Sequence, residues 1–347
     1  MRLSLAGLAG LAGLAALALV AGCAAAERTP DAPRPAVEPP APVVPAPPKV
    51  EAPRAIEVPA SPLAAPAAAV IKPAAGPSCT GAPGAGNDCN GESCCARIDV
   101  PEGDFELKAD GAPNGVSTHV KAFALDKYEA TVGRVRAWIK AGRPVPAEGD
   151  VLYAAGDKTV RWPKDAPVQS EQAMTGWKRY DTWTGGEERR PKNFLSWYTA
   201  AAFCHAEGGR LPTDAEWKYV AAGGDENRPY PWGSEPPSPE MAVFNCTGNG
   251  DQSCSLDDIL PVGSRPRGAG RWGHQDLAGS MFEWTLDGGT AEQPDTAEEV
   301  SRGGGFCYIG GVDRRAKTGL RPGVFRKESA TTVSHMVGVR CAYDHRT

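Results

Sequence analysis

The sequence has no excess of basic residues: 37 Lys and Arg stand against 42 Asp and Glu, for a formal net charge of −5. Proteins that bind nucleic acid concentrate positive charge against phosphates, so we expect no nucleic acid partner. The five histidines are scattered and form no H-x3-H-x-E pair. No G-x-S-x-G segment marks a serine nucleophile. The sequence therefore gives no support for a histidine-bound metal enzyme or a serine hydrolase.

Aromatic residues are absent from residues 24–78, which consist largely of alanine and proline. A segment so poor in large apolar side chains buries too little surface to offset the entropy of ordering it. We therefore predict that residues 23–78 form a disordered, polyproline-like tether with a rise of about 3.1 Å per residue.

The N-terminus has the layout of an export signal. Arg2 precedes an apolar run from Leu3 to Val20, and the segment ends in Val-Ala-Gly-Cys at Cys23. This ending resembles a bacterial lipobox. It predicts a lipoprotein signal peptide over residues 1–22 and a lipid on Cys23, which would place the chain at the bacterial cell envelope, on the outer membrane. An ordinary cleaved signal or a transmembrane helix is the alternative.

Ten cysteines are present, and nine remain once Cys23 is assigned to lipid. An oxidising compartment lets disulfides persist. Four of the nine lie in a Gly-rich lead-in, residues 79–96, without any C-x-x-C pair, so two disulfides are favoured over a zinc ribbon. Their connectivity stays open among Cys79, Cys89, Cys94 and Cys95. Cys246 and Cys254 flank a short polar loop and are predicted to close it.

Residues 97–347 have the length of one globular domain. Alternating apolar residues predict strands in the segments 96–110 and 117–131. Thr131, Ser196 and Thr213 are each placed to cap a helix, and Thr213 forms a T-x-x-E capping box with Glu216. Residues 143–192 lack periodicity and are predicted to be long loops with a few short elements.

Six motifs follow one another in a fixed order along this domain. They are FLSWYTAAAFCHAEGG, GGRLPTDAEWKYVAAGG, YPWG, DLAGSMFEW, RGGGF and VGVRCA. In this order they resemble the formylglycine-generating enzyme, or sulfatase-modifying factor, family over roughly residues 97–344. The resemblance implies an α+β, C-type-lectin-related fold with little regular structure, stabilised by disulfides. It also implies a disulfide between Cys204 and Cys341.

Family enzymes carry a C-x4-C pair after the RGGS motif, and the resemblance implies that this pair holds Cu(I) for oxygen chemistry. Two thiolates are soft ligands that suit this soft ion. Here only Cys307 follows the glycines, and Val312 stands five residues on. Copper is therefore not expected, and Cys307 is only a weak catalytic candidate. It is interpreted as a partly buried free cysteine or as the partner in an unassigned disulfide.

The resemblance further implies a structural Ca²⁺ site. Its ligands would be the carboxylates of Asp276 and Glu283 and the carbonyls of Gly279 and Met281, a hard oxygen set that suits this ion. In the alternative interpretation Glu283 forms only hydrogen bonds. A second family site would involve Asn245 and the carbonyl of Cys246.

Two functions follow from these observations. The favoured one is a non-catalytic, lipid-anchored module that binds a protein, peptide or glycan at the envelope. The other is a divergent oxidase that converts a substrate cysteine to formylglycine. The candidate contact residues are aromatic, and for each of them a place in the core is weighed equally: Trp162, Trp177, Tyr180, Trp183 and Tyr308.

Overall fold

The computed structural model describes residues 70–71, 76–79, 89–107, 115–156, 158–250, 253–287, 298–307 and 320–345. All of them belong to one compact unit, residues 40–347. The predicted signal peptide, Cys23, Tyr308 and Val312 lie outside the described residues.

The helices are few and short. They are α1 (Val132–Lys140), α2 (Trp197–Ala206) and α3 (Asp214–Ala221), with the 3-10 turns η1 (Glu171–Met174), η2 (Gly224–Glu226), η3 (Leu256–Asp258) and η4 (Pro266–Gly268). Each α-helix begins where the sequence predicts. The hydroxyl groups of Thr131, Ser196 and Thr213 accept hydrogen bonds from the backbone N–H groups three residues on. Within the described part of the chain, no helix has the length and apolar character that crossing a bilayer requires.

Two four-stranded sheets and two hairpins make up the β-structure. The first sheet is antiparallel, in the order β1 (Val70–Ile71), β2 (Arg97–Val100), β5 (Phe123–Asp126) and β12 (Ala342–Asp344). The second has the order β10 (Phe325–Ser329), β9 (Glu298–Arg302), β8 (Phe282–Trp284) and β11 (Val337–Gly338), with β11 parallel to β8. The hairpins are β3 (Gly103–Leu107) with β4 (Val116–Val120), and β6 (Val151–Ala155) with β7 (Lys158–Arg161).

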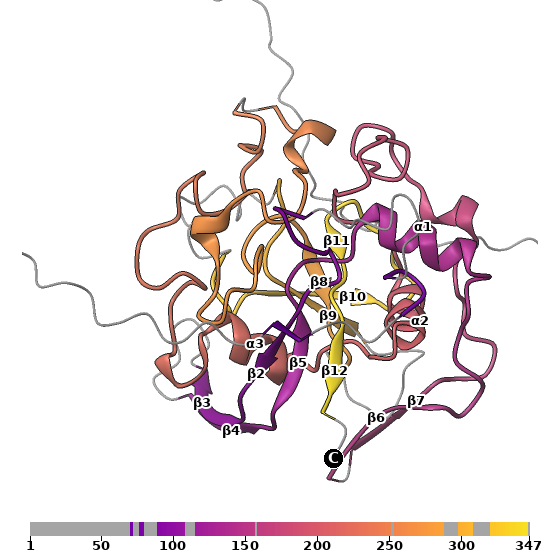
Figure 1. Ribbon diagram of the computed structural model, residues 1–347, viewed down its shortest axis with the longest axis horizontal. Coiled ribbons are helices and arrows are strands. Elements are labelled where there is room, and N and C mark those ends of the chain that lie inside the picture. Colours follow the sequence, from indigo (N-terminus) through magenta and orange to yellow (C-terminus); the bar gives the residue numbers. More distant parts are fainter. Residues whose placement is uncertain are drawn as a thin grey trace, which may run out of the picture. The chain divides into compact units, whose positions relative to one another are not determined.

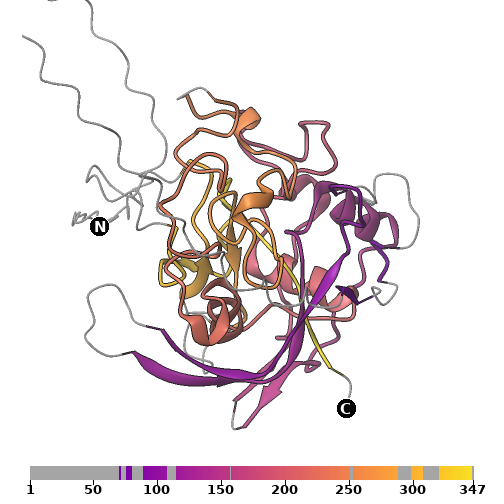
Figure 2. The same ribbon diagram turned by 60° about the vertical axis from the view of Figure 1, so that its left-hand side comes forward.

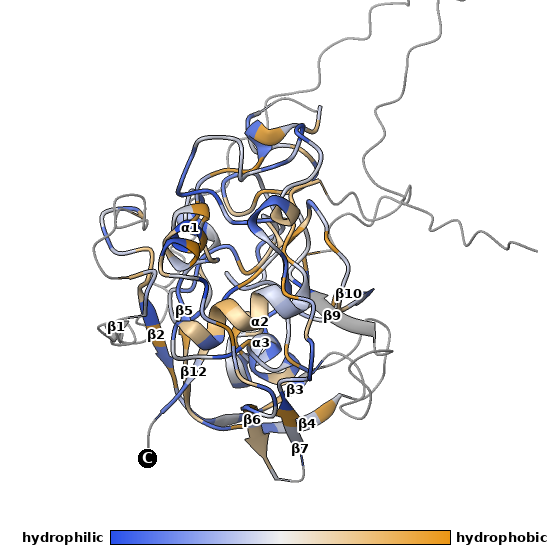
Figure 3. Ribbon diagram, turned by 90° about the vertical axis from the view of Figure 1, so that its right-hand side faces the viewer, coloured by the Kyte–Doolittle hydropathy of each residue, from blue (hydrophilic) through white to orange (hydrophobic). Residues whose placement is uncertain are grey.

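Segments far apart in sequence meet in the first sheet. Figure 1 shows the yellow C-terminal strand β12 beside the magenta β5, and the register pairs Ala342 with Leu125. In Figure 2 the β3–β4 hairpin continues from this sheet as a curved ribbon. Figure 3 shows that α2 carries mostly apolar colours, in agreement with the burial of all its residues from Trp197 to Cys204.

Tryptophans anchor the core between these elements. Trp138, Trp197, Trp217 and Trp284 are fully buried. Their indole N–H groups donate to partners inside the molecule: Pro144 O, Thr285 O, the Glu283 carboxylate and Leu195 O, respectively. A buried indole contributes a large apolar area and leaves no polar group unsatisfied when its N–H is bonded in this way.

The disulfides agree with the predictions and settle the open connectivity. Cys204 bonds to Cys341, and Cys246 to Cys254. In the lead-in, Cys79 bonds to Cys95 and Cys89 to Cys94. Both disulfides thus lie within the lead-in, directly before β2.

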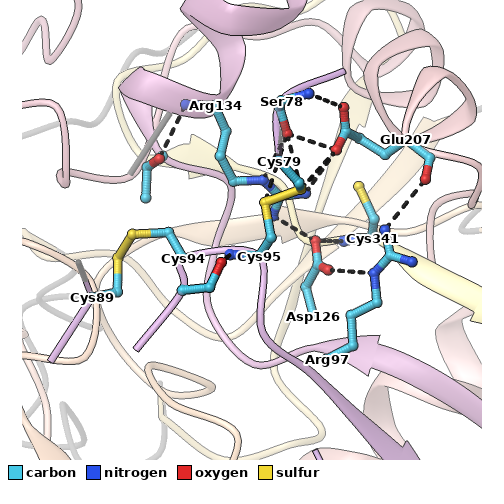
Figure 4. The surroundings of a disulfide bond; sticks show 12 residues. Ser78, Cys79, Cys89, Cys94, Cys95, Arg97, Asp126, Arg134, Glu207 and Cys341 are labelled. Atoms are coloured by element: carbon cyan, nitrogen blue, oxygen red, sulfur yellow. Dashed lines mark hydrogen bonds and ion pairs between the residues drawn. A yellow bond between two sulfur atoms is a disulfide. The ribbon is translucent and has the colours of Figure 1, made fainter. Parts of the chain in front are cut away.

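A buried polar network lies beside the first of these lead-in disulfides (Figure 4). The backbone N–H of Ser78 donates to one carboxylate oxygen of Glu207 at 3.0 Å, and its hydroxyl donates to the other at 2.6 Å. Arg134 donates to Ser78 Oγ at 3.1 Å and to Asp126 at 2.8 Å. Ser78 therefore belongs to the packed structure, because it satisfies a carboxylate that has no access to water. Val70–Ile71 also pair with β2, although the sequence predicts that the tether extends to residue 78.

Candidate functional site

An aromatic stack stands out on the surface of the molecule. The rings of Trp177 and Tyr180 each stack on the imidazole of His335, with centroid distances of 6.0 and 4.8 Å and interplanar angles of 20°. Phe194 and Phe306 lie 6.3 and 6.2 Å from the same imidazole. Trp177 is 63 % exposed, whereas His335 is buried. The stack therefore supports one large aromatic ring from beneath while leaving it open to solvent.

Among the described aromatic candidates, only Trp177 is exposed. Trp162 packs edge-on against Tyr198, with centroids 6.2 Å apart. The guanidinium of Arg136 covers the ring of Trp183 at 4.0 Å. Trp162, Tyr180 and Trp183 are all buried. The interpretation of these three as contact residues is wrong, because neighbouring side chains enclose their rings.

His335 is electrically neutral at pH 7. Burial, helped by the positive charge of Arg326, lowers the pKa of His335 to about 4. A neutral imidazole stacks on other rings without bringing a buried charge into the cluster. The stack is thus an apolar support and not a cationic centre.

Cys307 lies next to this stack. Its sulfur is 3.8 Å from His335 Nε2, and its side chain is buried. Cys307 is not a free thiol, so its interpretation as a free cysteine is wrong. Within the described ranges, the only group of three or more His, Cys, Asp and Glu side chains placed to share a metal ion is Cys79, Cys95 and Glu207. Its two sulfurs already form a disulfide.

The predicted calcium ligands lie in a second buried region. Gly263 N donates to the carboxylate of Asp276 at 2.5 Å. Glu283 accepts hydrogen bonds from Trp217 Nε1 at 2.8 Å and from two nitrogens of Arg340 at 2.9 and 2.7 Å. The backbone turns sharply here, with positive φ at Asp276, Gly279 and Ser280.

A third carboxylate, Glu129, joins this region. It accepts from the Ser280 hydroxyl at 2.9 Å and from Met281 N at 3.0 Å. Burial, and then the negative charges of Asp276 and Glu283, raise the pKa of Glu129 well above its usual range. Burial also raises the pKa of Asp276.

Two buried carboxylates, Glu129 and Glu283, and the partly buried carboxylate of Asp276 thus face one guanidinium. Arg340 is fully buried and pairs closely only with Glu283. Its single positive charge leaves negative charge uncompensated when all three acids are ionised. The donor set consists of hard oxygens, which fits Ca²⁺ chemically, although Glu283 already shares its oxygens with Arg340 and Trp217.

Residues 85–345 match the family model described as the sulfatase-modifying factor enzyme 1-like domain. The chain belongs to this family.

Its relatives include proteins named as active and as inactive enzymes. The chain is 28 % identical over 311 residues to the formylglycine-generating enzyme of Streptomyces coelicolor, covering 78 % of this chain and 96 % of that one. It is 26 % identical over 270 residues to the inactive Cα-formylglycine-generating enzyme 2 of Bos taurus, covering 71 % and 87 %. Membership of the sulfatase-modifying-factor family therefore does not by itself decide activity.

The solved structure of PvdO from Pseudomonas aeruginosa shows the same fold. It superposes with a TM-score of 0.50 at 18 % identity and covers 73 % of this chain and 95 % of that one. The predicted fold class, a disulfide-stabilised α+β domain of the formylglycine-generating-enzyme type with little regular structure, is confirmed.

Three polar residues of this sulfatase-modifying-factor domain escaped the sequence analysis. Glu129 follows β5 and reaches the predicted calcium segment, and Lys192 and Asn193 lie beneath the loop that carries Trp177. Each is fully buried. In the sequence each is only a charged or polar residue close to a predicted strand or helix start. Such residues are too common for their position to indicate a site.

Proposed function

We propose that this sulfatase-modifying-factor-like protein is a non-catalytic binding module of the bacterial cell envelope, anchored by lipid on Cys23. The exposed loop Gly176–Arg179 would make the ligand contact. The single observation that carries the proposal is the exposed ring of Trp177 on its buried aromatic support. Rigid aromatic rings supply contact area at low entropic cost.

The charge of this loop favours an anionic ligand. Lys178 and Arg179 are exposed beside Trp177, and neither forms an ion pair with a described residue. The guanidinium of Arg179 is held by the carbonyl of Cys254 at 2.8 Å. Two cations that form no ion pair within the described residues, next to a flat ring, fit an acidic polysaccharide. Its sugar rings have apolar faces, and its carboxylates would meet the cations.

Binding is tested with polygalacturonate as the acidic glycan, dextran as the neutral glycan and polyglutamate as the acidic peptide. We expect binding to polygalacturonate alone, weakened at least about tenfold by Trp177→Ala, as for a central contact residue. Val116→Ala is the matched control, since Val116 is exposed but belongs to the β3–β4 hairpin. Equal affinity of the Trp177→Ala variant and the parent chain for polygalacturonate would disprove this contact.

The oxidase alternative has weaker support. The chain has Val312 where the second cysteine of the family pair would stand, and Cys307 alone cannot supply two thiolates. The discriminating assay mixes the protein with Cu(I), oxygen, a reductant and a C-x-P-x-R peptide. Formylglycine formation above a Cys307→Ser control would refute the non-catalytic proposal.

We also propose that the carboxylates of Asp276 and Glu283, with the carbonyls of Gly279 and Met281, bind one structural Ca²⁺. The excess negative charge described above supports this site. Millimolar Ca²⁺ is expected to raise the thermal unfolding midpoint by several degrees at pH 7 and by less at pH 5, because protonated carboxyls do not bind it. Asp276→Asn should abolish the shift, and Asp225→Asn, at an exposed position, should preserve it. Absence of any shift in the parent chain would refute calcium binding.

A further inference from the structure

Asn193 joins the two segments that build the aromatic stack. Its amide Nδ2 donates to the carbonyl of Tyr180 at 2.6 Å and to the carbonyl of His335 at 3.0 Å. Its Oδ1 accepts from the hydroxyl and the backbone N–H of Thr182 at 2.9 and 3.3 Å. One buried amide thus fixes the loop that carries Trp177 and the segment that carries His335 relative to each other.

Lys192 holds the other end of the same loop. Its Nζ donates to the carbonyl of Met174, the last residue of η1, at 2.7 Å, and also to the carbonyl of Asn193. The C-terminal carbonyls of a helical turn lack internal partners, so a donor at this position completes the turn. The loop between residues 174 and 182 is therefore fastened at both ends by two consecutive residues.

Burial of the Lys192 side chain lowers the free energy of unfolding. The side chain is fully buried, and no described carboxylate lies within ion-pair distance. The charges that act on it are the carboxylate of Asp181, which accepts from the Trp183 N–H, and the guanidinium of Arg136. Burial of a lysine without an ion-pair partner destabilises a fold compared with an apolar side chain of similar size. Such a cost points to a local task that an apolar residue cannot perform.

We infer that Lys192 and Asn193 are positioning residues: they clamp the loop from Met174 to Thr182 so that Trp177 stays stacked on His335 and open to solvent. The role of Trp177 as a ligand contact rests on the proposed function. The clamp itself does not, because its hydrogen bonds join parts of this chain alone. Pre-ordering the loop removes part of the entropic cost that binding would otherwise carry.

The rate of cleavage by trypsin reports how often the loop opens, because Lys178 and Arg179 are exposed cleavage sites within it. Two variants of the full chain are informative. Asn193→Asp keeps the shape and the acceptor but loses both donations, and Lys192→Met keeps the length but loses its donor. We expect both to be cut after Lys178 and Arg179 at least about tenfold faster, because each variant loses hydrogen bonds that hold one end of the loop.

Matched controls are Asn227→Asp and Lys164→Met, which change the same residue types at exposed positions. The thermal unfolding midpoint of Lys192→Met should stay equal or rise, and this separates local opening from a general loss of stability. Trp177 emission, taken as the difference from Trp177→Phe, should shift to longer wavelength in both clamp variants. Unchanged cleavage at these two sites in a folded Lys192→Met variant would overturn the clamp. Faster cleavage with unchanged polygalacturonate binding would confirm the clamp and show that pre-ordering of the loop contributes nothing to ligand affinity, whereas the contact itself is tested by Trp177→Ala.

Discussion

At the scale of single residues, buried polar groups set the properties of the site. His335 stacks on two rings, and its imidazole is kept neutral by burial. The folded pKa of about 4 lies below the ordinary value of 6.5. The unfolded chain therefore binds a proton at His335 that the folded chain does not bind between these two values. The contribution of His335 to the free energy of unfolding is therefore fully present above pH 6.5 and is lost as the pH falls toward 4.

This linkage predicts a pH effect that can be removed by substitution. Between pH 7 and pH 4.5, the free energy of unfolding of the parent chain should fall by up to about 3 kcal/mol more than that of His335→Phe. Urea unfolding at the two pH values measures this difference. Burial also lowers the pKa of His274 well below its ordinary value. Because His274 is present in both chains, its effect on the free energy of unfolding is the same in both and drops out of the difference. Parallel pH profiles of the two chains would show that His335 is not held neutral.

At the scale of elements, short helices depend on their first turns. The α3 helix has eight residues, too few to be stable in water by itself. Thr213 and Glu216 satisfy each other's backbone N–H groups at 3.1 and 2.8 Å, as the capping box predicts. The helix also positions Trp217, whose indole donates to Glu283. The start of α3 thus affects the buried carboxylate cluster.

Removal of this cap should be measurable without loss of the fold. Thr213→Ala is expected to lower the free energy of unfolding by about 1 kcal/mol in chemical denaturation. Thr213→Ser retains a hydroxyl acceptor and should remain near the parent value. If the Ala and Ser variants were equally stable, the capping hydrogen bond would contribute nothing.

At the scale of the whole molecule, the chain closes on itself through its C-terminal segment. Strand β12 pairs with β5, Cys341 bonds to Cys204, and Arg340 pairs with Glu283. These contacts join residues more than fifty positions apart. A chain with so little regular structure depends on such closures, since few of its backbone groups are ordered by local hydrogen bonds alone.

The sequence by itself determined the family, the fold class and the helix starts. These properties depend on local chemistry that can be read in order along the chain: capping residues, glycine turns and the six motifs. It also predicted two disulfides, Cys204–Cys341 from the resemblance and Cys246–Cys254 from their short spacing.

Only the tertiary structure decided which side chains reach solvent and which polar groups meet. The sequence does not distinguish Trp162, Trp177 and Trp183, because all three lie in the same loop-rich segment. In the structure only Trp177 of these three is exposed, because side chains from other segments cover the other two rings. Glu129 joins the carboxylates of the predicted calcium segment across about 150 residues, and Asn193 reaches His335 across a similar distance. Such contacts depend on how distant segments pack, and no local pattern in the sequence records them.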